Sequence, residues 1–300
     1  MKNRDHGRPT MWCSVAARLA LVGLVLALGW GATVQAGPVE VPAKGVSKTI
    51  DKIREQKELR AGVAVSPPFL AQDPATGKWF GPAQEIGERT ASLLGVELKL
   101  IPTVWSVIIA GLQGNRFELV LAPLFATPKR VEVVDFVTYV NPGTCYLVLK
   151  DNPKKIDTLE DMNQPSVIIG TWTGGGTEQN VLAKYPKAGR NSIPMPVSGV
   201  HRIEDLLTRR IDVVPFDSAL ATVFAQEYPQ FKVLPGGPEA CKKNPDIPAP
   251  LGLAFNYGDP AFKKFMEAIV TDMKDQINVS TEKYGTVEYL RHQVKPAPPK

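Results

Sequence analysis

Two short stretches of the chain combine residues that could hold a small charged molecule. Residues 174–176 are three consecutive glycines, and Thr177 continues them into a helical pattern that runs to about residue 185. Amide N–H groups at the start of a helix are accessible and attract anions. Asp217 follows an expected strand at 211–215, and strand ends of α/β sheets are where ligand contacts usually lie. Asp217 could equally cap the helix that begins at Ser218.

Reaction chemistry has less support than binding. Glu85, Glu178 and Asp217 could act as general acids or bases, but nothing in the sequence pairs them. The chain has no nucleophile elbow and no phosphate loop of the Gly-x-x-x-x-Gly-Lys type. After residue 36 the only histidines are His201 and His292, which lie far apart and lack ligand-like spacing to cysteines or acids. We therefore expect no enzyme activity, no cofactor and no metal site.

Cys145 and Cys241 are the two cysteines that follow residue 36. Cys145 opens an expected strand, and Cys241 is expected in a loop. In an oxidising compartment such a pair is a candidate disulfide. Spacing alone also allows two unrelated buried thiols.

The first 36 residues have the three parts of a secretory signal peptide. Four basic residues come first, an apolar run follows at 19–30, and small residues lead to Ala36. The apolar run is too short for a membrane anchor, since spanning takes about 20 residues. We expect cleavage after Ala36 and export to the periplasm.

Removal of this leader changes the charge of the protein. The whole chain has 35 basic and 30 acidic residues, a net charge of +5. The leader holds four of the bases and one of the acids, so residues 37–300 carry a net +2. A net charge so close to zero does not indicate a surface that binds nucleic acid. A hydrophobic content of 44% is typical of a chain with a packed core.

Strand and helix patterns alternate twice along the chain, which is typical of α/β sheets with crossover helices. The first series has expected strands at 59–65, 96–101 and 117–122 and helices at 47–58, 84–94 and 105–113. The second has strands at 145–150, 166–171 and 211–215 and helices at 158–161, 174–185, 200–208 and 218–228. A strand at 251–255 and helices at 260–277 and 281–294 complete the chain.

This repetition predicts two α/β lobes, the first interrupted by the second. The expected parts are a linker at 37–46, lobe 1 at 47–141 plus 251–294, lobe 2 at 142–250 and a flexible tail at 295–300. The chain would cross between the lobes twice, near 140–143 and near 248–250.

Motifs in a consistent order resemble the periplasmic solute-binding proteins of ABC-type polar amino-acid uptake systems, family 3 of the bacterial extracellular solute-binding proteins. The matching pieces are 59–63 with Pro67-Pro68-Phe69, Gly81 with Glu85, 117–136, 170–177, 210–214 with Asp217, and 251–255. The resemblance runs from about residue 47 to 294. It implies the two-lobed type II periplasmic-binding-protein fold, in which each lobe is a mixed, mostly parallel sheet flanked by helices. Two hinge crossings join the lobes, which close on a zwitterion.

The resemblance also implies where the ligand binds. Arg130 occupies the position of the arginine whose guanidinium group binds a carboxylate through two hydrogen bonds. Asp217 would bind the ammonium group of the ligand. Phe69 and Trp105 are candidates for an apolar wall, although core packing is the commoner fate of such aromatics. The expected ligand-binding residues are Phe69, Trp105, Phe125, Arg130, Gly175, Gly176, Thr177 and Asp217.

Besides Pro82 and Ala83 in the element from Gly81 to Glu85, three positions near the expected ligand depart from the family pattern. Phe125 stands five residues before Arg130, where a serine or threonine is usual. Gly176 replaces the expected hydroxyl residue of the glycine loop, and Ser66 replaces an aromatic residue. The charged groups therefore match, whereas the neutral hydrogen-bonding groups do not, and the identity of the solute cannot be carried over.

By resemblance, the protein is a monomeric receptor that binds a small amino-acid-like or carboxylate solute in the cleft between its lobes. It would deliver this solute to the membrane permease of an ABC importer. Two alternatives stay open: a periplasmic enzyme of the cyclohexadienyl or prephenate dehydratase type, which shares the scaffold, and a sensory ligand-binding module.

Overall fold

A computed structural model describes residues 39–73, 75–173, 175–194, 200–286 and 288–290. All of them belong to one compact unit, Ala36–Lys300. The expected signal peptide, its cleavage site and the tail at 295–300 lie outside the described residues. Within the described ranges, no helix combines the length and the apolar character that crossing a membrane requires.

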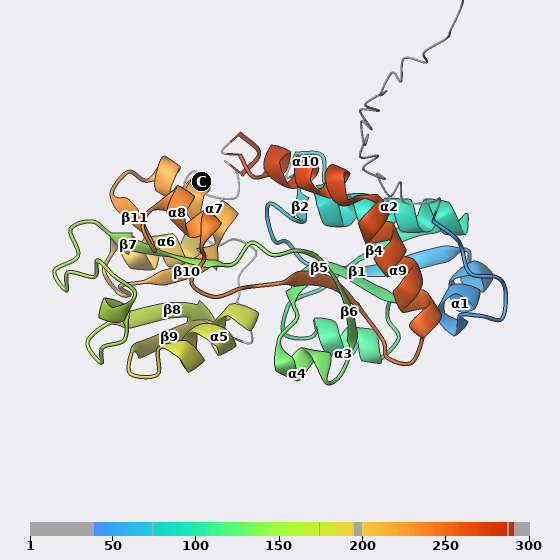
Figure 1. The fold of residues 1–300 in the computed structure, drawn as a ribbon, viewed down its shortest axis with the longest axis horizontal. Helices are drawn as coiled ribbons and strands as arrows, with labels where there is room; N and C mark the ends of the chain where they lie inside the picture. Colours follow the sequence, from blue (N-terminus) through green and yellow to red (C-terminus); the bar gives the residue numbers. More distant parts are fainter. Residues whose placement is uncertain (1–38, 74, 174, 195–199, 287, 291–300) are drawn as a thin grey trace, which may run out of the picture. The chain divides into compact units, whose positions relative to one another are not determined.

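The first sheet has five strands in the order β4-β1-β5-β12-β6 (Figure 1). Their bounds are Glu58–Val63 for β1, Glu97–Pro102 for β4, Leu119–Phe125 for β5, Asp135–Val140 for β6 and Leu251–Phe255 for β12. β1 pairs in parallel with β4 and β5, whereas β12 pairs antiparallel with β5 and β6. Four strands therefore run in one direction, and β12, which returns from late in the sequence, runs in the other.

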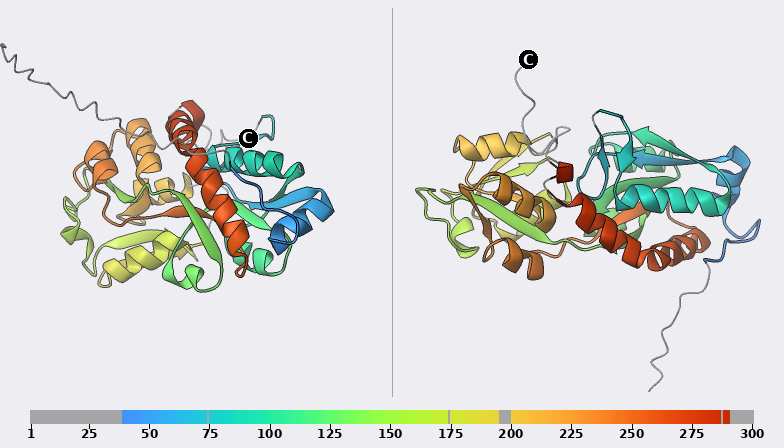
Figure 2. Two further views of the ribbon diagram at one scale, coloured as in Figure 1. Left: turned by 45° about the vertical axis from the view of Figure 1, so that its right-hand side comes forward. Right: turned by 90° about the horizontal axis from the view of Figure 1, so that it is seen from above.

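Helices cover this sheet and bury its apolar side chains. They are α1 (Lys48–Gln56), α2 (Pro82–Leu94), α3 (Ile108–Gln113), α4 (Pro128–Val131), α9 (Pro260–Asp272) and α10 (Lys274–Tyr284), with a small hairpin of β2 (Ala71–Gln72) and β3 (Trp79–Phe80). Ile86 of α2 and Phe262 of α9 are fully buried in one core cluster. The two helices lie side by side (Figure 2), and Arg89 of α2 pairs with Asp272 of α9 at 3.3 Å.

The second lobe repeats the arrangement of the first sheet. Its strands are β7 (Thr144–Leu149), β8 (Ile168–Trp172), β9 (Gly189–Ile193), β10 (Val214–Asp217) and β11 (Phe231–Leu234). β7 lies antiparallel between β10 and β11, while β8 and β9 are parallel. A parallel bridge between Ile169 and Val213 places β8 beside β10. Again four strands run in one direction. β7, which follows the connection from the first lobe, runs in the opposite direction.

In the second lobe a three-stranded sheet, β10-β7-β11, and a two-stranded sheet, β8-β9, are thus joined by a single bridge. Together with the first sheet they confirm the predicted fold class of two lobes with mixed, mostly parallel sheets. The second lobe is completed by the 3-10 helix Glu160–Met162, α5 (Gly176–Lys184), α6 (Val200–Leu207), α7 (Ser218–Glu227) and α8 (Pro238–Lys243). Arg202 of α6 is fully buried and donates to the carbonyl oxygens of Thr171 and Asn191, so it holds β8 and β9 together.

The two connections between the lobes lie next to each other. The chain leaves β6 at Val140 and enters β7 at Thr144, and it returns to β12 at Leu251. The Asn141 side chain accepts a hydrogen bond from the amide of Ala249 at 2.8 Å, which ties one connection to the other.

Several sequence predictions of element bounds were wrong. The last two helices meet at Met273 rather than near residue 278, and no glycine or proline marks this break. Ile269 of α9 and Ile277 of α10 are nevertheless both buried in one core cluster. The helix expected at 105–113 begins only at Ile108. β10 begins at Val214 instead of 211. Just before it, Asp212 and Val213 form backbone hydrogen bonds with β8, and the carboxylate of Asp212 accepts from the amide of Ile168 at 2.8 Å.

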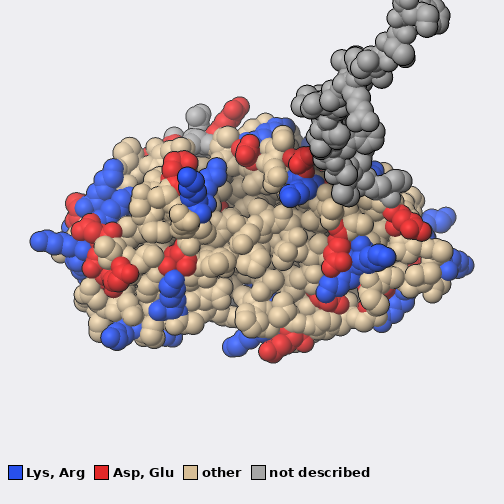
Figure 3. All heavy atoms as spheres, in the orientation of Figure 1, with Lys and Arg blue, Asp and Glu red and all other residues tan. Residues whose placement is uncertain are grey.

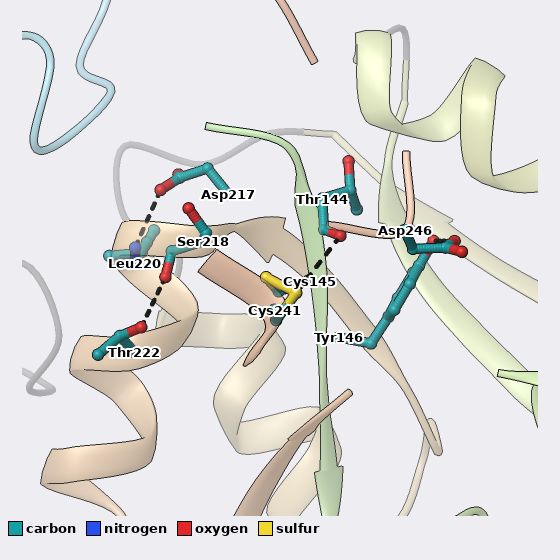
Figure 4. Close-up of a disulfide and its surroundings, with 9 residues drawn as sticks. All are labelled: Thr144, Cys145, Tyr146, Asp217, Ser218, Leu220, Thr222, Cys241 and Asp246. Carbon is teal, nitrogen blue, oxygen red and sulfur yellow. Dashed lines mark hydrogen bonds between the residues drawn. A yellow bond between two sulfur atoms is a disulfide. The ribbon is translucent and has the colours of Figure 1, made fainter. Parts of the chain in front are cut away.

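The two cysteines form a disulfide between β7 and α8 (Figure 4). The prediction that Cys241 lies in a loop was wrong, because residues 238–243 are helical. Both half-cystines are fully buried. Cys145 pairs across the sheet with Phe216, so the disulfide lies next to the strand that ends in Asp217.

Charged side chains of both signs are interspersed on the described part of the face in Figure 3. Several of them form exposed pairs, such as Lys99 with Glu58 at 3.0 Å and Arg209 with Asp151 at 2.8 Å. Exposed pairs of this kind contribute at most about 1 kcal/mol each.

Candidate functional site

A cavity of about 80 Å³ lies at the ends of strands from both sheets. β5 ends at Phe125, β8 at Trp172 and β10 at Asp217, and all three residues line the cavity. This is the usual place for a ligand in α/β sheets, because the carboxyl ends of parallel strands meet the starts of the helices that follow them. The cavity brings together all eight residues expected from the sequence: Phe69, Trp105, Phe125, Arg130, Gly175, Gly176, Thr177 and Asp217.

Arg130 supplies a positive charge to the cavity. It lies in the short helix α4, which Pro128 starts directly after the end of β5. Its Nη1 atom donates to the carbonyl oxygen of Phe125 at 3.1 Å. Burial lowers the pKa of Arg130, but an arginine stays protonated in proteins. A partly buried guanidinium of this kind favours a carboxylate as its partner, because two parallel hydrogen bonds can form.

The start of α5 supplies amide donors to the same cavity. Gly175 is the N-cap of α5 and offers no side-chain acceptor to the amides of the first turn. Gly176 and Thr177 are the first two helical residues, and both line the cavity. The N-terminal amides of a helix lack intrahelical partners and lie at the positive end of its dipole. This end of α5 can therefore bind an anion together with Arg130.

Asp217 supplies the opposite charge and also caps a helix. Its Oδ1 atom accepts from the amide of Leu220 at 2.9 Å at the start of α7 (Figure 4). Burial raises the pKa of Asp217 to about 6, although backbone hydrogen bonds from Leu220 and Ala219 oppose this shift. The capping role considered from the sequence is thus present, and it leaves the carboxylate at the cavity. A carboxylate held in such a place gains from a cationic partner.

Aromatic side chains form much of the remaining wall. Phe69 is only 1% exposed, so it serves the core as well as the cavity. Trp105 precedes α3 and is half-buried. Trp172 is 8% exposed and packs on Phe216, with ring centroids 5.3 Å apart. The indole Nε1 of Trp172 is buried, and no described residue accepts its hydrogen.

Among the other residues of the wall, Trp172 was a weaker candidate for the apolar wall from the sequence, and four were not expected to bind the ligand: Ser66, Pro123, Glu178 and Leu251. Trp172 and Glu178 flank the glycine loop, so their neighbourhood was a usable signal. The carboxylate of Glu178 accepts from the hydroxyls of Thr171 and Ser192. Leu251 lines the cavity because it pairs with Phe125 between β12 and β5. No local sequence pattern predicts that pairing.

The described residues hold no group of three or more histidine, cysteine or acidic side chains that could bind a metal ion. The lining of the cavity combines one guanidinium group (Arg130), two carboxyl groups (Glu178 and Asp217), the first residues of α5 and several apolar side chains. It can bind a small molecule that carries both an anionic and a cationic group.

Comparison with known proteins identifies the family of the chain. The sequence model of the bacterial extracellular solute-binding proteins, family 3, matches residues 59–286. The chain belongs to this family. The match begins in β1 and ends after α10, so it includes both sheets and the whole cavity. The family is mainly one of solute-binding receptors of the periplasm or cell exterior, which supports a periplasmic location.

Curated relatives show the range of this family. The L-cystine-binding protein TcyJ of Escherichia coli is 26% identical over 279 residues, which cover 91% of this chain and 96% of the relative. A cyclohexadienyl dehydratase of Pseudomonas aeruginosa is 22% identical over 227 residues, which cover 73% of this chain and 78% of the relative. Receptors and an enzyme are thus both similar to this chain.

Solved structures share the fold. An ancestral amino acid-binding protein, described as a precursor of cyclohexadienyl dehydratase, has a TM-score of 0.67 and 28% identity. The similarity covers 79% of this chain and 99% of that chain. A binding component of an ABC transporter from Wolinella succinogenes, complexed with lysine, has a TM-score of 0.67 and 23% identity, with 79% and 99% coverage. The predicted two-lobed fold is confirmed by these neighbours.

Proposed function

We propose that this protein is a periplasmic receptor that binds an amino-acid-like solute in the cavity and delivers it to an ABC importer. The observation that supports this most is the presence of Arg130, the start of α5 and Asp217 around one cavity between two lobes. The family and its curated relatives support the same role. The receptor acts as a monomer, its lobes are residues 47–141 plus 251–294 and 142–250, and the leader 1–36 directs its export.

The charges of the site match those of a zwitterion. A solute carboxylate that loses its water on binding needs charged and hydrogen-bonding partners, which Arg130 and the α5 amides provide. A solute ammonium needs an anion, and Asp217 provides it. Trp105, Phe125 and Trp172 exclude water around these pairs, which strengthens each of them.

The size of the cavity limits what fits without movement. A volume of about 80 Å³ has room for roughly five to eight water-sized groups. This is enough for the carboxylate, ammonium and α-carbon of an amino acid with a short side chain. A solute as large as cystine would require the lobes to move apart, which hinge motion at the two connections allows.

Calorimetric titration tests this function with L-cystine, L-arginine, L-lysine and succinate, the last of which has carboxylates but no amino group. Truncation in Arg130→Ala should weaken the binding of any of these solutes by about 2–5 kcal/mol. Arg130→Lys should also weaken it, because an ammonium cannot form the two parallel hydrogen bonds of a guanidinium. Asp217→Asn should weaken the binding of the amino acids to a similar degree and leave succinate unaffected. Lys129→Ala is the matched control, since Lys129 is the exposed neighbour of Arg130 in α4.

Each outcome has a distinct meaning. Loss of affinity in both variants supports an amino acid as the solute. Loss of affinity in Arg130→Lys alone indicates a solute that has a carboxylate but no amino group. If neither variant differs from Lys129→Ala, the assignment of the site is wrong.

A dehydratase is the second candidate, and one observation favours it. Asp217, whose pKa burial raises to about 6, shares the cavity with Glu178. A carboxyl group with a raised pKa in a cleft is suited to general-acid catalysis. Incubation with prephenate, followed by its disappearance, tests this: turnover that Asp217→Asn abolishes would replace the receptor function with an enzymatic one.

A further inference from the structure

Phe125 and Gly176 meet across the two lobes. Gly176 is the first residue of α5 in the second lobe and is buried, while Phe125 ends β5 in the first sheet. A Cβ atom placed on Gly176 would lie 2.5 Å from the Cβ of Phe125 and 2.9 Å from two of its ring carbons. Real carbon atoms do not approach this closely, so the side chain of Phe125 lies directly against the backbone of Gly176.

Phe125 is also bound to Arg130. Its carbonyl oxygen accepts from the guanidinium at 3.1 Å. Its own position is set by the first sheet, since it pairs with Leu251 of β12. One residue thus contacts both groups that can bind an anion, the guanidinium through its carbonyl group and the start of α5 through its ring.

We infer that the contact between Phe125 and Gly176 holds the lobes together at this point and assembles the anion site, by placing the first amides of α5 opposite Arg130. This inference rests on the proposed function, because it concerns the same cavity. It makes Phe125 and Gly176 positioning residues, whose effect on the solute passes through Arg130 and the α5 amides.

The contact accounts for two departures from the family pattern at once. A large ring at position 125 leaves no room for any side chain at position 176. The two hydroxyl groups that the family pattern places at these positions are therefore lost together. A solute carboxylate in this protein is held by the guanidinium and by backbone amides, and neither of these two side chains donates to it.

Because the two residues belong to different lobes, a side chain too large for the space between them should hinder the closure of the lobes and leave the folding of each lobe unchanged. The backbone of Gly176 is helical and has no positive φ, so an alanine there meets no backbone strain. The added methyl group can be accommodated by separation of the lobes, which moves α5 away from Arg130. Gly176→Ala should therefore lower the affinity of the protein for its solute.

A double-mutant cycle of Gly176→Ala and Phe125→Ala tests the inference. The probe is whichever of L-cystine, L-arginine and L-lysine binds the unmodified protein most tightly in calorimetry. Overpacking typically has an effect of 1–3 kcal/mol, so Gly176→Ala should weaken binding by about 5- to 140-fold. In the Phe125→Ala background the same substitution should change affinity by less than about twofold, since its clash partner is gone.

Two controls separate this contact from general damage. Gln179→Ala changes an exposed residue of α5 and should leave affinity unchanged. The thermal midpoint of solute-free Gly176→Ala should match that of Gln179→Ala, because neither lobe is destabilised. Arg130→Lys tests the proposed function separately: if it has no effect, the site itself is wrong, whereas an effect of Arg130→Lys without one of Gly176→Ala overturns only the contact.

Small-angle scattering without any solute gives a second readout that does not depend on the choice of probe. Gly176→Ala should show a larger radius of gyration than the unmodified protein. The double variant, in which the clash partner of the new methyl group is gone, should be no more expanded than Gly176→Ala. Equal curves for all three proteins, or effects of the two substitutions that simply add, would overturn the inference.

Discussion

The raised pKa of Asp217 predicts that solute binding depends on pH. Burial raises this pKa to about 6, compared with about 3.9 for an unperturbed aspartate. An ammonium group binds the ionised carboxylate, so protonation of Asp217 competes with the solute. The carboxylate of an amino acid stays ionised above about pH 5, because its pKa is near 3.5 or below. Affinity for an amino acid should therefore fall as the pH is lowered through 6.

The magnitude follows from the fraction of Asp217 that is ionised. With a pKa of about 6, roughly 97% of the molecules carry the carboxylate at pH 7.5 and roughly 10% at pH 5. The apparent dissociation constant should thus be about tenfold higher at pH 5. The stability of the solute-free protein should change in the opposite sense. A group whose pKa is raised by folding contributes stability at low pH, and this contribution is lost as the pH rises from about 4 to 6.

Calorimetry of L-arginine or L-lysine binding at pH 7.5, 6 and 5 measures the effect. Asp217→Asn is the matched control, because it retains a capping side chain but does not titrate, and its residual affinity should be nearly flat over this range. Glu178 also lines the cavity, so the control is needed to assign the titration. A constant affinity in the unmodified protein, or a tenfold change that persists in Asp217→Asn, would refute the assignment of the ammonium to Asp217.

Two further predictions concern the second lobe. Replacing Cys145 and Cys241 together by serine should lower the free energy of unfolding by about 4–5 kcal/mol, since the disulfide closes a loop with a sequence separation of 96; an unchanged denaturation midpoint would contradict this. Asp246→Ala should destabilise the protein by about 1–3 kcal/mol, because Asp246 accepts hydrogen bonds from the hydroxyls of Tyr146 and Tyr185 at 2.6 Å each. Asp151→Ala, which breaks an exposed pair with Arg209, is its control and should change stability by less than about 1 kcal/mol.

The charged part of the site could be predicted from the sequence because it depends on local features. Asp217 was found as an acid at the end of a strand, and the glycine loop as the opening of a helix. Arg130 was found through a motif that keeps its order along the chain. The signals for Asp217 and for the glycine loop lie within a few residues, and the alternation of strands and helices places them at strand ends. The role of Arg130 was implied by the resemblance to the family and not by a local pattern.

Elements with weak local signals were missed or misplaced. β9 is a short polar strand, Gly189–Ile193, whose existence depends on pairing with β8. The break between α9 and α10 at Met273 carries no glycine or proline, so the helical pattern continues through it. In both places packing against the rest of the protein outweighs local propensity.

The closing contact of the cavity was decided only by the tertiary structure. The sequence by itself determined that position 125 is aromatic and that position 176 is glycine, and each looked like an isolated departure from a family pattern. The structure shows that they occupy one space, because β5 of one sheet and α5 of the other lobe converge there. The distance between segments so far apart in the chain is set by the packing of whole lobes. A reading of neighbouring residues contains no information about it.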